Sequence, residues 1–366
     1  MTHKNSSKFI IRPVRENDYE AFLELATLTG GALTNIPKDP EIVRARVEDS
    51  ERSFDLRTER PGSHRYLFFL EDRESGEIAG TCGIISKVGG FQPFYTYEIR
   101  NERFSYPPLE IDHEVKILSP KINHDGPSEI CCLFLRPEFR RSGLGRLLSL
   151  SRFHFMGAFP RRFDKNVLAE LRGTTEDRSS PFWDGVARHF FKMDFREADY
   201  LSGLDDKEFI AELMPKHPLY LPLLPPEAVA AIGQPHRDAV PALKVLLGEG
   251  FRYQNQIDIF DAGPIVESPL TSIRTIQKRR EARVEKIADD LPDSDQMLLS
   301  NAQIDFRACI GRVAENGESV SIDRATAEAL KIEKGHTVAF SPLFSPAEIS
   351  PEQLSPPFLQ PEKTPS

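Results

Sequence analysis

The pattern of apolar and polar positions predicts a strand followed by a helix near the middle of the chain. An apolar run at residues 130–135 has the length and composition of a buried strand. Pro137 ends it, because proline lacks the N–H that a central strand needs. The apolar positions that follow have helical spacing: Leu144, Leu147, Leu148 and Phe153. We therefore expect a strand, a turn and a helix in direct succession.

Shorter apolar runs around this unit predict the rest of a sheet. The expected strands lie at residues 10–14, 66–70, 78–85, 95–99, 115–118 and 167–171. The turn sequence DRESG joins the second and third of them in a hairpin. Helical spacing predicts helices at residues 19–26, 43–54 and 182–191. The expected order is therefore a strand, two helices, a run of strands, a helix, a strand and a helix.

The second half of the chain predicts smaller elements. Residues 209–214 and a turn at 215–218 come first, and we then expect helices at 227–232 and 242–247 and a strand at 253–260. Residues 271–290 are charged and helix-prone, which favours a solvated surface helix. Residues 306–313 and 319–322 form an expected hairpin across Glu315-Asn316-Gly317, followed by a helix at 325–330 and a strand at 337–340.

This pattern predicts four regions. Residues 1–200 form the first domain, and residues 201–265 form a second α/β region that completes the site. Residues 266–340 hold the charged helix and a small β subdomain. Proline and serine dominate residues 341–366, which predicts a disordered tail.

Composition excludes several classes of protein. The 366-residue chain has a net charge of −9, which gives no electrostatic case for nucleic acid. No apolar stretch approaches the roughly 20 residues of a membrane span, and the first residues lack an apolar signal core. We therefore expect a cytoplasmic protein.

The four cysteines have the spacing of neither a disulfide framework nor a metal site. We expect buried, reduced thiols and no bound metal. Cys131 and Cys132 are adjacent on the predicted strand, so their side chains should face opposite sides of the sheet.

The turn after the central strand has the composition of an anion site. Arg140, Gly143 and Gly145 are spaced R-x-x-G-x-G and lead directly into the helix. Free amides and the helix dipole favour an anion there, and glycine lets a phosphate approach the backbone. This loop is predicted to hold a pyrophosphate.

The order of elements resembles the GCN5-related N-acetyltransferase fold, in which R-x-x-G-x-G cradles the pyrophosphate of coenzyme A. The resemblance implies an α+β fold with a mixed sheet flanked by helices, a second α/β region and a small C-terminal β subdomain. It also implies that acyl-CoA binds at Arg140, Gly143 and Gly145.

Longer segments make the resemblance more specific. They are TGGALTNIP (29–37), HDGPSEICCLFLRPEFRRSGLGRLLSLSRFHFM (124–156), LAELRG (168–173), SPFWDGVARHFFKMDF (180–195), ADYLSGLDDKEFIAELMPKHPLY (198–220), IGQPH (232–236) and EGFRYQNQIDIFDAGP (249–264). Together they are similar to the arginine N-succinyltransferase family. That likeness implies transfer of succinyl from succinyl-CoA, a co-substrate rather than a bound cofactor, to the α-amine of L-arginine.

The resemblance also implies roles for single residues. Leu133 falls on the family's acyl-CoA contact, where backbone amides could bind the thioester oxygen. His236 falls on its proton donor, and imidazole exchanges protons near neutrality. His217 is the rival for this role, ahead of His124 and His189.

Other site residues stay open at this point. Acylation of Cys131 or Cys132 would need a nearby base and is less favoured than direct attack. Groups of the 30–37 loop, together with Glu170 and Arg172, could reach a pocket for the guanidinium and the succinyl carboxylate.

Two alternative functions remain. One is an acyl-CoA N-acyltransferase acting on ornithine or another amine. The other is a non-catalytic acyl-CoA-binding subunit. Either a homo-oligomer or pairing with a related subunit is compatible with the family.

Overall fold

The structure is a computed structural model of the chain. It describes residues 7–29, 38–55, 58–90, 92–140, 143–176, 179–204, 207–289, 291, 295–344, 349–354 and 356. The predicted 30–37 loop lies outside the described residues.

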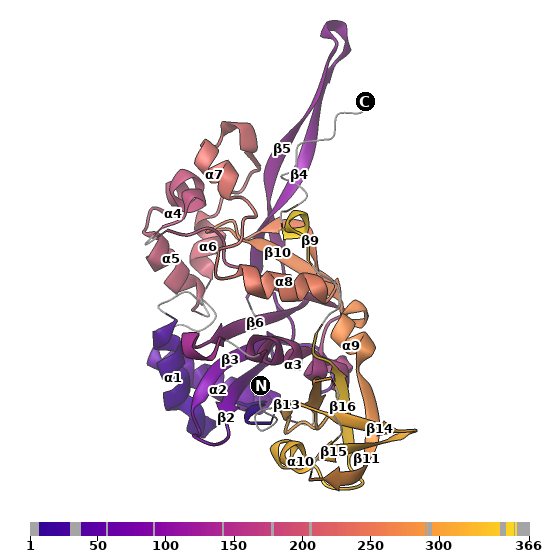
Figure 1. Cartoon of the computed structure of the whole chain (residues 1–366). Coiled ribbons are helices and arrows are strands. Elements are labelled where there is room, and N and C mark those ends of the chain that lie inside the picture. Colours follow the sequence, from indigo (N-terminus) through magenta and orange to yellow (C-terminus); the bar gives the residue numbers. More distant parts are fainter. Residues whose placement is uncertain are drawn as a thin grey trace.

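The strands form one long mixed sheet that runs through the whole molecule (Figure 1). Its order is β14-β15-β11-β16-β12-β13-β1-β2-β3-β6-β7-β10-β9-β4-β5-β8. Only the pairs β6–β7 and β11–β15 are parallel among the described strands. The strands are β1 Phe9–Pro13, β2 Arg65–Asp72, β3 Ile78–Ile85, β4 Phe94–Tyr106, β5 Ile111–Asn123, β6 Ser128–Leu135, β7 Asn166–Glu170, β8 Leu219–Tyr220, β9 Arg252–Ile257, β10 Pro264–Pro269, β11 Arg280–Ala288, β12 Met297–Ser300, β13 Ala308–Gly311, β14 Val313–Asn316, β15 Ser319–Asp323 and β16 Thr337–Pro342.

Helices cover both faces of this sheet. The helices are α1 Tyr19–Leu28, α2 Pro40–Ser53, α3 Leu144–Ala158, α4 Arg188–Phe191, α5 Phe195–Ser202, α6 Glu208–Leu213, α7 Pro226–Ala231, α8 Val240–Gly248, α9 Arg274–Lys278 and α10 Arg324–Leu330. Helices α1 and α2 pack on one face of β2, β3 and β6, whereas α3 packs on the other face. Helices α4 to α7 gather beside β4 and β9 (Figure 1).

The predicted succession of a strand, two helices, a run of strands, a helix, a strand and a helix is confirmed: five strands, β2 to β6, lie between α2 and α3. One helix is of a different kind. The predicted 66–70 and 78–85 hairpin is the antiparallel pair β2–β3. The predicted helix at 182–191 is a π-helical turn, Trp183–Ala187, followed by α4. The mixed sheet with flanking helices is therefore present as expected.

Helix α3 connects the N-terminal part of the sheet to its C-terminal end. Its residue His154 is fully buried. The Nδ1 atom of His154 lies 3.0 Å from Ser300 Oγ on β12, and its Nε2 atom lies 2.9 Å from Ser341 Oγ on β16. Strand β13 also pairs directly with β1, at Ile11 and Ala308. The C-terminal unit is thus joined to the first strand by the same sheet.

The pair β4–β5 is much longer than its apolar runs predict. Each strand has 13 residues, and the two are paired along their whole length, from Phe94↔Asn123 to Tyr106↔Ile111. The outer half projects from the body as a two-stranded arm (Figure 1). Residues 100–103 are all polar, so the apolar pattern that predicts a strand at 95–99 ends there although the strand continues.

The prediction of a charged surface helix at residues 271–290 is wrong. The segment has only a five-residue helix, α9, followed by strand β11. β11 pairs with β15 on one side and β16 on the other, and it buries Val284 between them. Pairing on both sides outweighs the local helix propensity of its charged residues.

The predicted disorder from residue 341 onward is wrong for the part that the structure describes. Leu343 is buried in the core. Residues 351–354 form a short 3₁₀ turn, and the Leu354 carbonyl accepts a 2.7 Å hydrogen bond from the Tyr253 hydroxyl. The side chains of Leu343 and Leu354 pack against the hydrophobic core, whereas the proline content of this part of the sequence predicts disorder. Residues 345–348, 355 and 357–366 lie outside the described residues.

The predicted hairpin at the C-terminal end is confirmed at its turn but not in its first strand. The hairpin is β14–β15, and Gly317 has the positive φ of 66° that its turn requires. The predicted strand at 306–313 is instead β13, which pairs with β12 and β1, and only residue 313 belongs to β14. The predicted helix and closing strand are α10 and β16. Among the described residues, no helix is long and apolar enough to cross a membrane.

Candidate active site

Strands β6 and β7 separate from one another and open a space in the sheet. They are paired only at Ser128↔Val167 and Glu129↔Leu168. Beyond these pairs β7 stays bonded to β10, while β6 stays bonded to β3. The backbone of β6 from Ile130 onward therefore has no strand partner on its β7 side among the described residues. Such a divergence leaves peptide groups free to meet a ligand.

A bulge lies in β6 beside this opening. Gly83 pairs with Cys131 and Thr81 pairs with Phe134, so two residues of β6 oppose one residue of β3. Cys132, inside the bulge, has a positive φ of 55°, an uncommon conformation for a residue other than glycine. The bulge interrupts the regular ladder between β6 and β3 at Cys132 and Leu133.

The bulge also overturns the prediction that the two cysteines face opposite sides. Both thiols lie on the side covered by α1 and α2, and their Sγ atoms are 3.4 Å apart. The extra residue cancels the alternation of side chains at this point. The other part of the prediction is confirmed: Cys82, Cys131, Cys132 and Cys309 are buried and form no disulfide.

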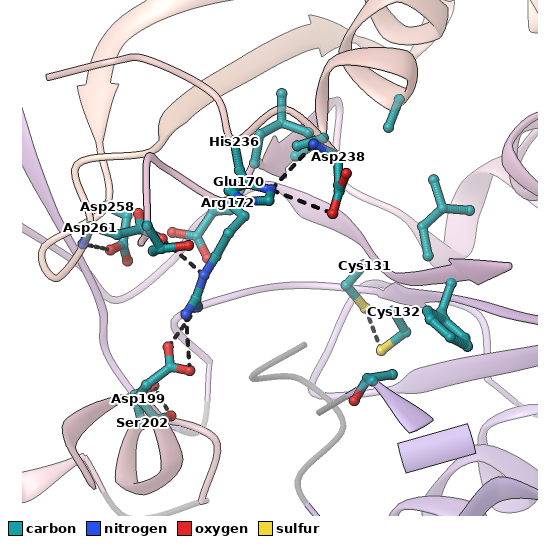
Figure 2. A pocket seen from close by; sticks show the side chains of 18 of the residues that line it. Cys131, Cys132, Glu170, Arg172, Asp199, Ser202, His236, Asp238, Asp258 and Asp261 are labelled. Atoms are coloured by element: carbon teal, nitrogen blue, oxygen red, sulfur yellow. Dashed lines mark hydrogen bonds and ion pairs between the residues drawn. The ribbon is translucent and has the colours of Figure 1, made fainter. Parts of the chain in front are cut away.

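A pocket of about 960 Å³ occupies the opening between the strands. Residues 129–134 of β6 form one wall, and residues 169–172 at the end of β7 form another. Helix α5, the loop at 258–261 and the segment around His236 complete it. Figure 2 shows His236 and Arg172 across the pocket from Cys131 and Cys132. Both the first predicted domain and the 201–265 region therefore contribute to the walls.

His236 is held in the wall by local backbone contacts. Its N–H donates a 2.7 Å hydrogen bond to the Arg172 carbonyl, next to the bridge between Gly173 and Pro235. Its Nδ1 atom accepts a 3.2 Å hydrogen bond from the Asp238 N–H. The neutral ring therefore carries its proton on Nε2. Asp238 Oδ2 lies 3.8 Å from Nδ1 and would pair with the ring when it is charged.

The rival histidines lie elsewhere. His217, His124 and His189 are exposed and are not among the residues that line the pocket. Of these four candidates, the pocket wall contains His236 alone.

Arg172 is neutralised by two carboxylates. It contacts Asp199 through both Nη atoms, at 2.7 and 3.2 Å, and its Nε lies 3.3 Å from Asp261 Oδ2 (Figure 2). The guanidinium also stacks over Phe195, 5.1 Å from the ring centre. A paired and stacked arginine of this kind holds β7, α5 and the 258–261 loop together.

The same wall carries excess negative charge. Burial holds the pKa of Glu170 well above its usual range, and the nearby carboxylates Glu129 and Asp258 add to the effect. Burial and Asp258 raise the pKa of Asp261 to about 7, although Arg172 opposes the shift. Carboxylates gathered in this way favour a cationic ligand. None of Asp199, Asp258 and Asp261 was indicated as a site residue by the sequence, because only the fold brings them to β7.

The predicted anion loop lies at the far end of β6. Arg140 lines the pocket and donates a 3.0 Å hydrogen bond from Nε to the Leu135 carbonyl. Gly143 is the N-cap of α3 with a positive φ of 81°, a conformation that favours glycine. Gly143 and Gly145 are not among the lining residues, and residues 141–142 between Arg140 and Gly143 lie outside the described part of the chain. Among the described residues, no group of histidine, cysteine and acidic side chains is arranged to hold a metal ion.

The opening in the sheet, the bulge in β6 and His236 all belong to one pocket, and comparisons with known proteins identify its class as that of an acyltransferase. Two family descriptions match the chain: arginine N-succinyltransferase beta subunit over residues 9–275, and the C-terminal domain of that subunit over residues 280–342. The arginine N-succinyltransferases of Escherichia coli O139:H28 and Citrobacter koseri are each 40% identical over 332 residues, which cover 90% of this chain and 96% of each relative.

A solved structure agrees with these sequence matches. Subunit AI of arginine/ornithine succinyltransferase from Pseudomonas aeruginosa superposes with a TM-score of 0.84 at 31% identity, covering 92% of this chain and 99% of that one. The chain belongs to the arginine N-succinyltransferase family.

Proposed function

We propose that this chain transfers a succinyl group from succinyl-CoA to the α-amine of L-arginine in the pocket between β6 and β7. The observation that carries the assignment is the opening itself, with a bulged strand on one wall and His236 on the other. The family match supports the choice of substrates. The arrangement also favours a GCN5-related N-acetyltransferase type of fold for the part of the chain that contains β1 to β7.

The acyl donor would lie along β6. Its thioester oxygen would accept a hydrogen bond from the backbone amide of Leu133, in the bulge beside the opening between the strands. Arg140 and the N-terminus of α3, at Gly143 and Gly145, would hold the pyrophosphate at the other end of the strand. The donor then spans the wall from the anion loop to the bulge.

His236 would supply the proton that the departing thiolate needs. The C–N bond forms as the amine attacks the thioester carbon, the C–S bond breaks, and the sulfur takes up a proton. The ring would donate as the imidazolium: its Nε2 proton passes to the sulfur, and Asp238 Oδ2, 3.8 Å from Nδ1, faces the charged ring. The proton that the attacking amine loses is taken up at Nε2, which returns the ring to its starting state.

The acidic wall would receive the acceptor. L-Arginine has a guanidinium and an α-ammonium group, and both are cations. A cation bound beside Glu170 and Asp258 would offset the repulsion between these two carboxylates. Binding of a cation there lowers the cost of the ionised Glu170. This arrangement supports arginine as the acceptor, and ornithine, which is also a cation, is the second candidate.

Release of free CoA tests the assignment. Succinyl-CoA is mixed with the protein, with and without L-arginine, and free thiol is followed over time. We expect thiol release only when arginine is present, with a higher kcat/KM for arginine than for ornithine or lysine. Equal release without arginine refutes the proposed transfer, and CoA binding without turnover favours a non-catalytic subunit.

A further inference from the structure

Arg152 is a buried cation in the pocket wall without an acidic partner. It lies on α3, lines the pocket and is only 2% exposed. No carboxylate of the residues that the structure describes forms an ion pair with it, and the ionisable groups nearest to it are thiols, among them Cys82 and Cys131. Burying a guanidinium without a counter-charge is costly, because arginine stays protonated in proteins.

Two other arginines of the wall are paired, unlike Arg152, and Arg140 belongs to the proposed pyrophosphate site. Arg172 is neutralised by Asp199 and Asp261, as described above. Arg136 forms a 2.9 Å ion pair with Glu24. An anion entering the pocket would therefore meet competing carboxylates at either of these residues, whereas Arg152 offers an uncompensated charge.

The hydrogen bonds of Arg152 fix its position and leave donors available. Its Nε and Nη2 atoms donate to the Ser149 carbonyl and Oγ, each at 3.0 Å, and Nη1 donates to the Cys131 carbonyl at 3.4 Å. A guanidinium has five N–H groups. The remaining two, one on each Nη, have no partner within the described part of the chain, and together they suit the two oxygens of a carboxylate.

The position of Arg152 relative to the bulge identifies the anion. The guanidinium bonds to the Cys131 carbonyl, directly before the bulge residues that would face the thioester. The anion loop lies at the opposite end of β6, so the acyl chain points away from that loop and toward Cys131. Succinyl carries its free carboxylate at the far end of this chain.

We propose that Arg152 recognises the free carboxylate of the succinyl group and so determines which acyl donor the enzyme accepts. This inference rests on the proposed function and adds to it a residue for donor specificity. Acyl groups that end in a methyl group would leave the charge of Arg152 unpaired, and they would be rejected for that reason.

Two donors and two neutral variants test the role. Succinyl-CoA is compared with butyryl-CoA, which has the same chain length and a methyl group in place of the carboxylate. Arg152→Met removes the charge but keeps side-chain length, and Arg152→Gln also retains polar contacts. We expect the wild-type kcat/KM for succinyl-CoA to exceed that for butyryl-CoA at least about a hundredfold. Each variant should lose at least about a hundredfold with succinyl-CoA and change less than about threefold with butyryl-CoA.

Arg162→Met is the matched control. Arg162 is also buried, donates to the carbonyls of Ser53 and Asp55 at 3.0 and 2.9 Å, and does not line the pocket. Any loss of activity in this variant should affect both donors equally. The affinity for free CoA, measured by calorimetry, should be unchanged in the Arg152 variants because free CoA has no acyl carboxylate.

The outcomes separate this inference from the proposed function. Equal losses with both donors, or an unchanged preference for succinyl-CoA, overturn the role of Arg152 while leaving succinyl transfer intact. Failure of both neutral variants to fold also overturns it, because an unpaired buried charge should not be needed for stability. A wild-type protein that does not transfer succinyl to arginine refutes the proposed function and this inference together.

Discussion

Acidification should destabilise the protein through one buried histidine, His154. Burial lowers the pKa of His154 to about 3, and the positive charge of Arg279 contributes to the shift. An unfolded histidine has a pKa of about 6.5. The folded state therefore holds this ring neutral over a pH range in which the unfolded chain binds a proton. Stability is lost as the pH falls below about 6.5, and the loss continues toward about 3.

The size of the effect follows from the two pKa values. At about pH 5 the unfolded ring is almost fully protonated and the folded ring is almost fully neutral. The linkage relation then gives a loss of about 2 kcal/mol relative to about pH 8. This figure is insensitive to the folded pKa, provided that this pKa stays well below 5.

The assay compares the wild type with His154→Gln by urea denaturation between about pH 8 and pH 5. Glutamine can keep a polar contact with Ser300 or Ser341 and does not titrate. Other groups, such as Asp261 with its raised pKa, titrate in both proteins and cancel in the comparison. We expect the wild type to lose about 2 kcal/mol more than the variant. Parallel pH dependences would refute the reasoning.

Three further substitutions address the pocket. His236→Ala should lower kcat at least about a hundredfold with a smaller change in succinyl-CoA affinity, and near-normal turnover would remove its proposed role. Gly143→Leu should weaken CoA binding in calorimetry, because a side chain strains the positive φ at this N-cap; an unchanged Kd would argue against the pyrophosphate assignment. Arg172→Met should cost about 3–5 kcal/mol in urea denaturation by leaving Asp199 and Asp261 unpaired, and a stability equal to wild type would contradict the pairing.

The apolar pattern along the chain is sufficient to predict those helices and strands that bury their own apolar side chains. Strands β2 and β3 are buried along almost their whole length and are short apolar runs, and helix α3 has apolar residues at helical spacing, so their sequences predict them. Strand β11 has charged residues at most positions and is a strand because β15 and β16 flank it. No pattern within residues 280–288 contains that information.

The catalytic role of a single residue could be predicted only where the resemblance to a known family indicated that residue. His236 was assigned by its match to the family, since a histidine after proline in a loop has no distinguishing local signal. The meeting of Cys131 with Cys132 depends on a bulge, and that bulge is a mismatch between β6 and β3. Whether Arg152 forms an ion pair depends on which carboxylates the fold brings near it. The sequence alone does not show which residues are neighbours in space.

The pairing of β1 with β13 sets the order in which the chain can complete its fold. Ile11 meets Ala308, so one edge of β1 remains open until almost the whole chain has been synthesised. At typical synthesis rates of about 5–20 residues per second, this interval lasts about 15–60 s. Strand β2 can cover the other edge of β1 early, but the open edge is able to pair with other chains in the meantime. Yield of the folded protein should therefore depend on how well nascent chains are kept apart.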